Sequence, residues 1–156
     1  MKKYSAVDEA VIHASPSVVF RALLDECAGV THWWAPHVRV TPLSDPPFDH
    51  VGATARSAVH SGVTVHFLWR ILAIEPDKLI QIEYAEGDLV GVGTLTLEPV
   101  PAGTLLRYDW HTQTNSWAAH ILAPILDMGK RHSHLMVLGF EGLDAYVTGK
   151  SQQASR

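Results

Sequence analysis

The chain has 156 residues, of which 47% are hydrophobic and 18% are charged, and its formal net charge is −4. A chain of this length typically folds as one domain that buries roughly 70% of the surface of its unfolded form. The charge balance lacks the basic excess by which proteins bind nucleic acid or anionic membranes, and the lone cysteine, Cys27, excludes an internal disulfide and any multi-cysteine metal site.

A single domain is the simplest interpretation of the chain. No internal repeat or linker divides it, so we predict one domain over residues 1–149 and a disordered tail over residues 150–156. Asp8 and Glu9 interrupt the apolar residues of the N-terminal stretch, which therefore lacks the apolar region of a signal peptide. No apolar run approaches the ~18 residues that a membrane-spanning helix needs. We expect a cytoplasmic protein, a monomer or homodimer, with no stable membrane insertion.

The N-terminal part of the chain predicts a strand followed by a short helix. Residues 4–13 alternate around Val7, Glu9 and Val11, which is a weak strand pattern. In ASPSVVFRALLDE the serine before Pro16 stands at the N-cap and the proline at the first helical position, ahead of apolar residues at helical spacing. This arrangement predicts a helix that begins at Pro16.

The stretch THWWAPH, residues 31–37, follows that helix and places two tryptophans side by side. It predicts a second short helical turn before HVRVTPL continues as a strand. Because adjacent residues point in different directions, we predict that Trp33 seals the core beneath the first helix and that Trp34 forms part of a cavity wall or mouth.

Residues 51–114 are typical of a meander of antiparallel strands. A Ser61–Gly62 turn separates ATARSAVH from VTVHFLWRILAI, and turn-rich stretches separate LIQIEYA, LVGVGTLTLE and GTLLRYDWHT. The glycines of GDLVGVG open a strand and not a helix, so they favour a bulge or a tight bend over a phosphate-binding loop.

After Ser116 the hydrophobic period changes to 3.6 and holds for about thirty residues, which predicts a long C-terminal amphipathic helix. Its apolar stripe consists of Leu122, Ile125, Met128, His132, Leu135, Met136, Gly139 and Leu143. The elements together define an α+β domain, in which the long helix can bury its stripe only against the sheet.

Charged residues fix the outer face of the later strands, so the residues between them point inward. The predicted inward residues are Val65, Phe67, Trp69 and Ile71, then Ile80, Ile82 and Tyr84, then Leu106, Tyr108, Trp110 and Thr112. This set suits a pocket for an apolar, ringed ligand that a few hydrogen bonds orient. A filled core is the alternative, because inward aromatic residues usually pack against a helix.

Histidines supply the remaining candidates for chemistry. His132 is the one histidine on the predicted apolar stripe, and it is either a general acid or base toward a ligand or a core histidine that a neighbour satisfies. The chain has ten histidines but no HExxH or comparable spacing, so we predict no metal site and no cofactor. Cys27 has no partner that would activate it as a nucleophile, and we predict that it is a small buried hydrophobe.

Several of these stretches resemble the START-like (SRPBCC) helix-grip superfamily, and within it the bacterial proteins called polyketide cyclase/dehydrase-like or lipid-transport-like. The resemblance covers nearly the whole chain and rests on ASPSVVFRALLD, THWWAPHVRV, EGDLVGVGTLTLEP, GTLLRYDWHT and the segment from SWAAHILAPIL through HSHLMVLGFEGLDAYV. It implies a strongly curved antiparallel sheet of about six to seven strands, with two short helices and a long C-terminal helix around an apolar cavity.

The resemblance also carries over individual positions. Trp33 and Trp34 lie where the short helices lead into the second strand. Arg131 stands where similar sequences often have asparagine. The other matching positions are Tyr84, Asp88, Trp110, Trp117 and His132.

Three functions stay open, because one fold serves many activities. The first is the binding of a hydrophobic, aromatic or lipid-like small molecule, favoured because the predicted inward set contains no carboxylate–histidine pair. The second is an aromatase/cyclase or dehydratase acting on a polyketide-like substrate, with His132, Tyr84 and Tyr108 as proton donors or acceptors. The third is a co-chaperone-like or stress-response interaction module. The predicted ligand-binding residues are Trp34, Phe67, Trp69, Tyr84, Tyr108, Trp110, Met128 and His132.

Overall fold

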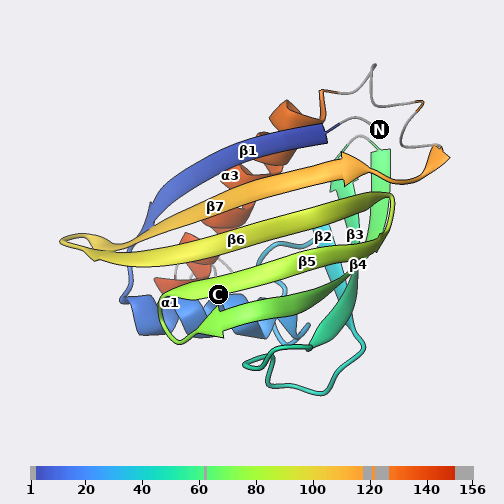
Figure 1. Cartoon of the computed structure of the whole chain (residues 1–156). Coiled ribbons are helices and arrows are strands. Elements are labelled where there is room, and N and C mark those ends of the chain that lie inside the picture. Colours follow the sequence, from blue (N-terminus) through green and yellow to red (C-terminus); the bar gives the residue numbers. More distant parts are fainter. Residues whose placement is uncertain (1–2, 62, 118–120, 122–126, 150–156) are drawn as a thin grey trace.

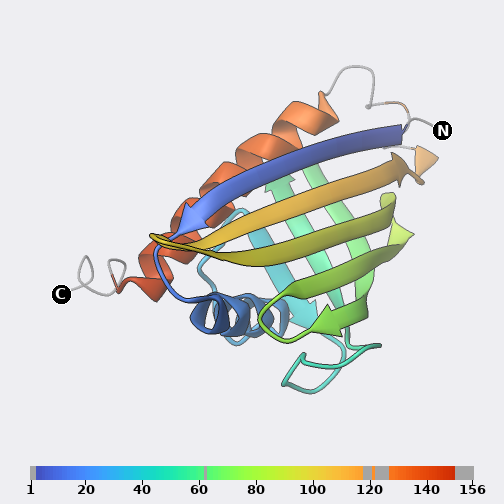
Figure 2. The ribbon, with the colours of Figure 1, turned by 60° about the vertical axis from the view of Figure 1, so that its left-hand side comes forward.

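A seven-stranded antiparallel sheet curves around one long helix in the computed structural model, which describes residues 3–61, 63–117, 121 and 127–149 (Figures 1 and 2). The strand order is β1-β7-β6-β5-β4-β3-β2, so β2 to β7 form a meander that β1 closes at the β7 edge. The strands are β1 (Lys3–Ile12), β2 (Val38–Pro42), β3 (Thr54–Ser61), β4 (Val63–Glu75), β5 (Leu79–Gly87), β6 (Leu89–Val100) and β7 (Gly103–Thr114). The structure confirms the predicted α+β helix-grip fold.

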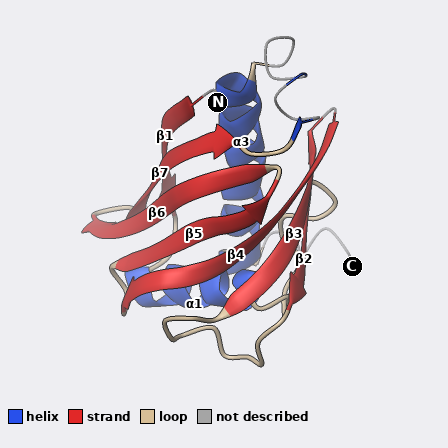
Figure 3. Cartoon of the chain, turned by 45° about the vertical axis from the view of Figure 1, so that its right-hand side comes forward, coloured by secondary structure: helices blue, strands red, loops and turns tan. Residues whose placement is uncertain are grey.

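The first helix, α1 (Pro16–Cys27), begins where the sequence predicts it. Ser15 is its N-cap and Pro16 occupies the first helical position, where the missing N–H of proline costs nothing. Val19, Phe20 and Leu23 are buried on one side of the helix. Figure 3 shows α1 crossing one end of the sheet, and Leu23, Glu26 and Cys27 of this helix line the internal cavity.

The C-terminal helix, α3 (Met128–Val147), begins later than the period predicts. Asp127 is its N-cap, and the carboxylate of this residue accepts a hydrogen bond of 3.1 Å from the backbone N–H of Lys130. An aspartate side chain at this position satisfies a free N–H of the first turn, which favours a helix start over helix continuation. The helix predicted from Ser116 onward is therefore interrupted at Asp127, although Trp117 and Ile121 are helical; Leu122, Ile125 and the tail 150–156 lie outside the described residues.

Residues 31–37 also differ from their prediction, because residues 33–37 form turns and not a second short helix. Pro36 has no backbone N–H with which to continue a helix. The N–H groups of His37 and Val38 both donate to the carbonyl of Trp34, at 3.1 and 3.3 Å, and the chain then enters β2. The predicted Ser61–Gly62 turn includes Gly62, which lies outside the described residues.

Strand β1 places one charged residue on the inner face of the sheet. Val7, Glu9 and Val11 are exposed on the outer face, whereas Asp8 alternates inward with apolar neighbours. In the register of β1 with β7, Asp8 lies opposite Tyr108. A carboxylate therefore lies between the sheet and α3, where apolar residues are the rule.

Candidate functional site: an internal cavity with one polar end

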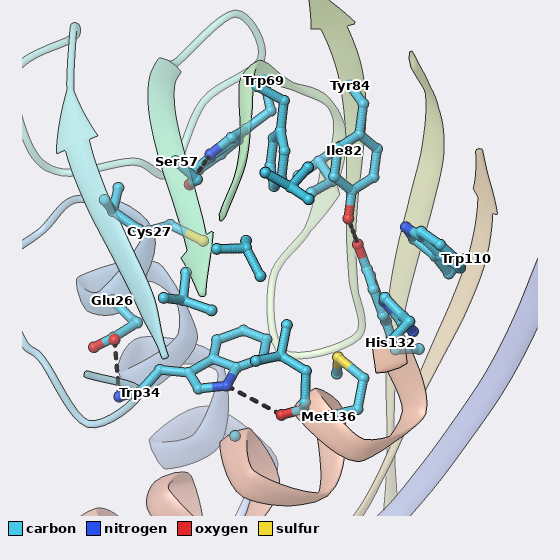
Figure 4. Close-up of a pocket in the computed structure, with 18 of the residues that line it drawn as sticks. Glu26, Cys27, Trp34, Ser57, Trp69, Ile82, Tyr84, Trp110, His132 and Met136 are labelled. Carbon is cyan, nitrogen blue, oxygen red and sulfur yellow. Dashed lines mark hydrogen bonds between the residues drawn. The ribbon is translucent and has the colours of Figure 1, made fainter. Parts of the chain in front are cut away.

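The concave face of the sheet, α1 and α3 enclose a cavity of about 160 Å³ (Figure 4). All eight predicted ligand-binding residues line it, from Trp34 before β2 to His132 on α3. Most of the other lining residues are aliphatic or aromatic, among them Leu23, Val40, Val65, Ile82, Leu95 and Phe140. The space between sheet and helix is therefore only partly filled by the core.

Two tyrosines form a hydrogen-bonded pair in the wall of this cavity. The hydroxyl groups of Tyr84 on β5 and Tyr108 on β7 contact each other directly, and both side chains are buried (Figure 4). Burial raises the pKa of Tyr84 to about 12, against the opposing effect of hydrogen bonds with Tyr108 and Trp110. Burial likewise raises the pKa of Tyr108 well above 10. Both phenols are therefore neutral hydrogen-bond donors near pH 7.

Gly93 on β6 makes room for this pair. A Cβ at residue 93 would collide with the hydroxyl and ring of Tyr108, which crosses directly over the glycine. The glycine-rich stretch thus has a local packing role in addition to its effect on the backbone, where Gly91 has φ +146°. The register shifts of the sheet lie instead in the pairing of β4 with β5.

His132 covers the inner face of β7 at the same end of the cavity. Its ring stacks on Trp110 with the centroids 4.0 Å apart and the planes at 9°, and it lies 5.5 Å from the ring of Tyr108. Burial lowers the pKa of His132 to about 4, and the nearby Asp8 carboxylate opposes that shift. The imidazole is therefore neutral at pH 7.

Asp8 is the site residue that sequence reasoning missed. Its Oδ2 lies 3.4 Å from Nδ1 of His132, and the two side chains are only 12% and 10% exposed. The structure thus contains the inward carboxylate–histidine pair that the sequence did not reveal. Its only signal was a charged residue in phase with Ala6, Ala10 and Ile12 on a weakly patterned strand.

The two tryptophans of THWWAPH lie parallel, with ring centroids 5.7 Å apart and planes at 12°, and both line the cavity. Trp34 thus forms part of the cavity wall as predicted, whereas Trp33, which was predicted only to seal the core beneath the first helix, lines the cavity as well. Alternation applies to extended chain, whereas residues 33–37 form turns. The Glu26 carboxylate holds this conformation by accepting hydrogen bonds from the N–H groups of Trp33 and Trp34, each at 3.1 Å, and from the hydroxyl of Thr31 at 2.8 Å.

Each indole N–H also has a helix carbonyl as its acceptor. Trp33 donates to the carbonyl of Ala22 on α1, and Trp34 donates to that of Leu135 on α3, both at 3.2 Å. Trp34 therefore joins the segment before β2 to the long helix while its ring faces the cavity (Figure 4). Cys27 also lines the cavity, and burial raises the pKa of its thiol to about 12, so it behaves as a neutral, weakly polar side chain.

The positions carried over by resemblance do not all reach the cavity. Arg131 lines it beside His132. Asp88 lies at the turn between β5 and β6, where its carboxylate accepts a hydrogen bond of 2.9 Å from the N–H of His66. Trp117 is 80% exposed. Asp88 thus has a local structural role, whereas Arg131 and His132 share the cavity wall.

Two further features bear on what the site can bind. No group of three histidine, cysteine, aspartate or glutamate side chains among the described residues has the geometry of a metal site. In the same parts of the chain no helix has the length and apolar character needed to cross a membrane.

A curved sheet that grips a long helix around an apolar cavity defines a helix-grip protein with an internal ligand-sized space. The chain belongs to the family described as polyketide cyclase/dehydrase and lipid transport, whose model matches residues 4–131. The match ends one residue before His132. None of the curated proteins searched matches the chain.

Solved structures show the same fold at low sequence identity. TTHA0849 from Thermus thermophilus is 17% identical, with a TM-score of 0.70 over 96% of this chain and 99% of that one. Mll3558 from Rhizobium loti is 22% identical, with a TM-score of 0.68 over 92% and 96%. The crystal structure of Ara h 8.0201 is 16% identical, with a TM-score of 0.67 over 95% and 99%. These likenesses confirm the fold.

Proposed function

We propose that the protein binds a small hydrophobic molecule, aromatic or lipid-like, in the internal cavity. The observation that carries this proposal is the lining itself, in which aliphatic side chains and the faces of Trp34, Phe67 and Trp69 surround a space left open by the core. Broad aromatic faces and aliphatic walls favour apolar ligands, and a few polar groups at one place orient them.

The cavity volume supports a compact ligand. A space of 160 Å³ is close to the roughly 150 Å³ of an engineered apolar cavity that binds benzene. One ring, or a ring with short substituents, therefore fits better than an extended polyketide or a long acyl chain. Since Tyr84, Tyr108 and His132 lie together at one end, the preferred ligand carries one oxygen atom that meets them.

The experiment compares a cavity-filling variant with a matched variant on the other face of the same strand. Ile82 points into the cavity from β5 (Figure 4), whereas the amide of the neighbouring Gln81 donates a hydrogen bond to the hydroxyl of Thr94. Binding of phenol, 2-naphthol and decanoate is measured by saturation-transfer NMR. We expect wild-type protein and Gln81→Trp to bind a ring probe and Ile82→Trp to lose that binding.

Native mass spectrometry of the freshly purified protein supplies an independent measurement. A co-purified small apolar molecule that Ile82→Trp lacks would support the proposal. Equal binding of every probe by Ile82→Trp and wild type would place the ligand elsewhere, and failure of all three probes to bind wild type would contradict the proposal.

A further inference from the structure

Asp8 and His132 form a largely buried polar pair, and His132 lines the cavity. Removing a carboxylate from water is costly, and apolar residues of similar size commonly stabilise a protein as well as a buried ion pair does. Here the pair comes from β1 and α3, and His132 faces the cavity beside two phenols. A polar cluster of this kind in a mostly apolar cavity is typical of a site that moves a proton.

The geometry favours one nitrogen of His132, Nε2, as the base. Nδ1 is the ring nitrogen that faces Asp8, at 3.4 Å, so the carboxylate favours the tautomer with its proton on Nδ1. That tautomer leaves a lone pair on Nε2. Stacking on Trp110 at 4.0 Å holds the ring in its plane. Asp8 is thus a positioning residue, and His132 is the group that would exchange a proton with a ligand.

The tyrosine pair supplies the complementary group. Tyr84 and Tyr108 carry two hydroxyl protons, and the hydrogen bond between them uses one. The second proton can be donated to an oxygen atom of a ligand. Because burial keeps both phenols neutral, this donor persists across the neutral pH range. The ring of Tyr108 lies 5.5 Å from that of His132, so donor and base serve the same end of the cavity.

We propose that the cavity catalyses proton transfer next to the carbonyl group of a small cyclic ketone, with His132 as the base and the Tyr84–Tyr108 pair as the donor to the carbonyl oxygen. This inference rests on the proposed binding of a small apolar molecule in the same cavity. It assigns a substrate class, enolisable ring ketones, and a reaction that needs no co-reactant.

The reaction balances without any added group. Nε2 of His132 removes a proton from the carbon next to the carbonyl, the electrons of that C–H bond form a carbon–carbon double bond, and the carbonyl π electrons move to the oxygen. The tyrosine pair stabilises this enolate by hydrogen bonding. In a β,γ-unsaturated ketone the proton then returns from His132 to the γ carbon, which gives the conjugated isomer. A base as weak as His132, whose pKa is about 4, suffices for this step when neutral donors hold the enolate.

The test uses cyclohex-3-enone, whose conversion to cyclohex-2-enone is followed by the ultraviolet absorbance of the conjugated product. Binding of the ketone is measured on the same samples by saturation-transfer NMR. We expect wild-type protein to accelerate the conversion over buffer, His132→Gln to lose about a hundredfold of that acceleration, and both to bind the ketone. His134→Gln is the control, because His134 is exposed on the same helix. Tyr84→Phe should also slow the reaction.

The pH dependence of the rate tests the role of Asp8, because a purely structural role would leave that dependence unchanged. The groups around His132 are Asp8 on β1, Tyr108 on β7, Tyr84 on β5 and the adjacent Arg131. Because Asp8 raises the pKa of His132, Asp8→Asn should lower the rate and move the acid limb of the pH–rate profile to lower pH. Glu9→Gln, an exposed neighbour on β1, should leave both unchanged.

The outcomes separate the two proposals. Binding of the ketone without acceleration, or equal rates for His132→Gln and His134→Gln, would overturn the proton-transfer inference and leave ligand binding in place. Failure of wild-type protein to bind the ketone or the other ring probes would overturn both. An unchanged profile in a folded Asp8→Asn variant would remove Asp8 from its positioning role.

Discussion

The indole ring of Trp34 lies directly against Gly139 in the middle of α3, where a Cβ would collide with three atoms of the ring. The same indole donates its N–H to the carbonyl of Leu135, one turn earlier on the helix. The absence of a side chain at residue 139 therefore lets the segment before β2 lie close to the long helix. This contact sets the position of one cavity wall, and it can be tested by changing either partner.

Gly139→Ala should lower the free energy of unfolding by up to about 2 kcal/mol. Replacing glycine by alanine in a helix interior normally adds about 1 kcal/mol to the free energy of unfolding. Overpacking against the indole ring lowers the same free energy by about 1–3 kcal/mol. Gly129→Ala is the matched control, since a Cβ there meets only a carboxylate oxygen at 3.7 Å, and it should be neutral or slightly stabilising. Urea denaturation measures both variants. A stabilised Gly139→Ala would show that Trp34 moves away easily.

Glu26→Ala should destabilise the protein and loosen the cavity together. The substitution leaves the part-buried N–H groups of Trp33 and Trp34 without their carboxylate acceptor, and each should cost less than the about 1–3 kcal/mol of a fully buried unsatisfied group. Urea denaturation and titration with 2-naphthol measure the two effects. Asp25→Ala, at a less buried neighbouring position, should change neither by a comparable amount. If Glu26→Ala is destabilised but binds 2-naphthol as tightly as wild type does, the carboxylate contributes to stability and not to the shape of the cavity.

The structure also shows how far sequence patterns predict this fold. On β7 the exposed Arg107 identifies the outer face, so the buried positions of Tyr108 and Trp110 follow from alternation alone. The start of α1 follows from Ser15 and Pro16 for an equally local reason. Each of these features depends on residues within one element, and a single sequence contains that information.

The missed features depend on contacts between distant elements. Asp8 acquires its meaning only when β1 pairs with β7 and α3 packs across both, which no local period encodes. The parallel arrangement of Trp33 and Trp34 depends on a turn that Glu26 holds from α1. Asp8 was therefore invisible to pattern analysis, whereas the inward positions of Tyr84, Tyr108 and His132 and the aromatic walls were predictable.

Gly93→Ala should disrupt the tyrosine pair, because the added methyl group occupies the place of the Tyr108 hydroxyl. We expect a loss of about 1–3 kcal/mol in the free energy of unfolding. Tyr108→Phe removes the atom closest to the new methyl group, so the double variant Gly93→Ala/Tyr108→Phe should lose less than the sum of the two single variants. A double-mutant cycle by urea denaturation measures this coupling. Strict additivity would contradict direct contact between the two positions.

Cys27 should react slowly with iodoacetamide in the folded protein. Raising the pKa of a thiol from 9.0 to about 12 lowers its thiolate fraction at pH 8 on the order of a thousandfold. Alkylation at pH 8 is followed by mass spectrometry in the folded protein and in protein unfolded by guanidinium. About 6 M guanidinium unfolds ordinary domains. Cys27→Ala/Val30→Cys supplies an exposed thiol nearby, because Val30 is 57% exposed. Equal labelling rates for the two proteins would show that Cys27 is accessible and ionised.

His132 should make the protein less stable in acid. Its pKa is lowered from 6.5 to about 4 in the folded state, chiefly by burial. Below pH 6.5 the unfolded chain binds a proton that the folded protein does not, so the free energy of unfolding falls as the pH drops from 6.5 to 4. The total loss from this group is on the order of 3 kcal/mol.

His132→Gln lacks the titrating ring, and its stability should decline less over this interval, whereas His134→Gln should follow wild type. Urea denaturation at several pH values between 7 and 4 provides the comparison. A wild-type protein that gained stability relative to His132→Gln on acidification would show instead that the imidazole is protonated and paired with the Asp8 carboxylate.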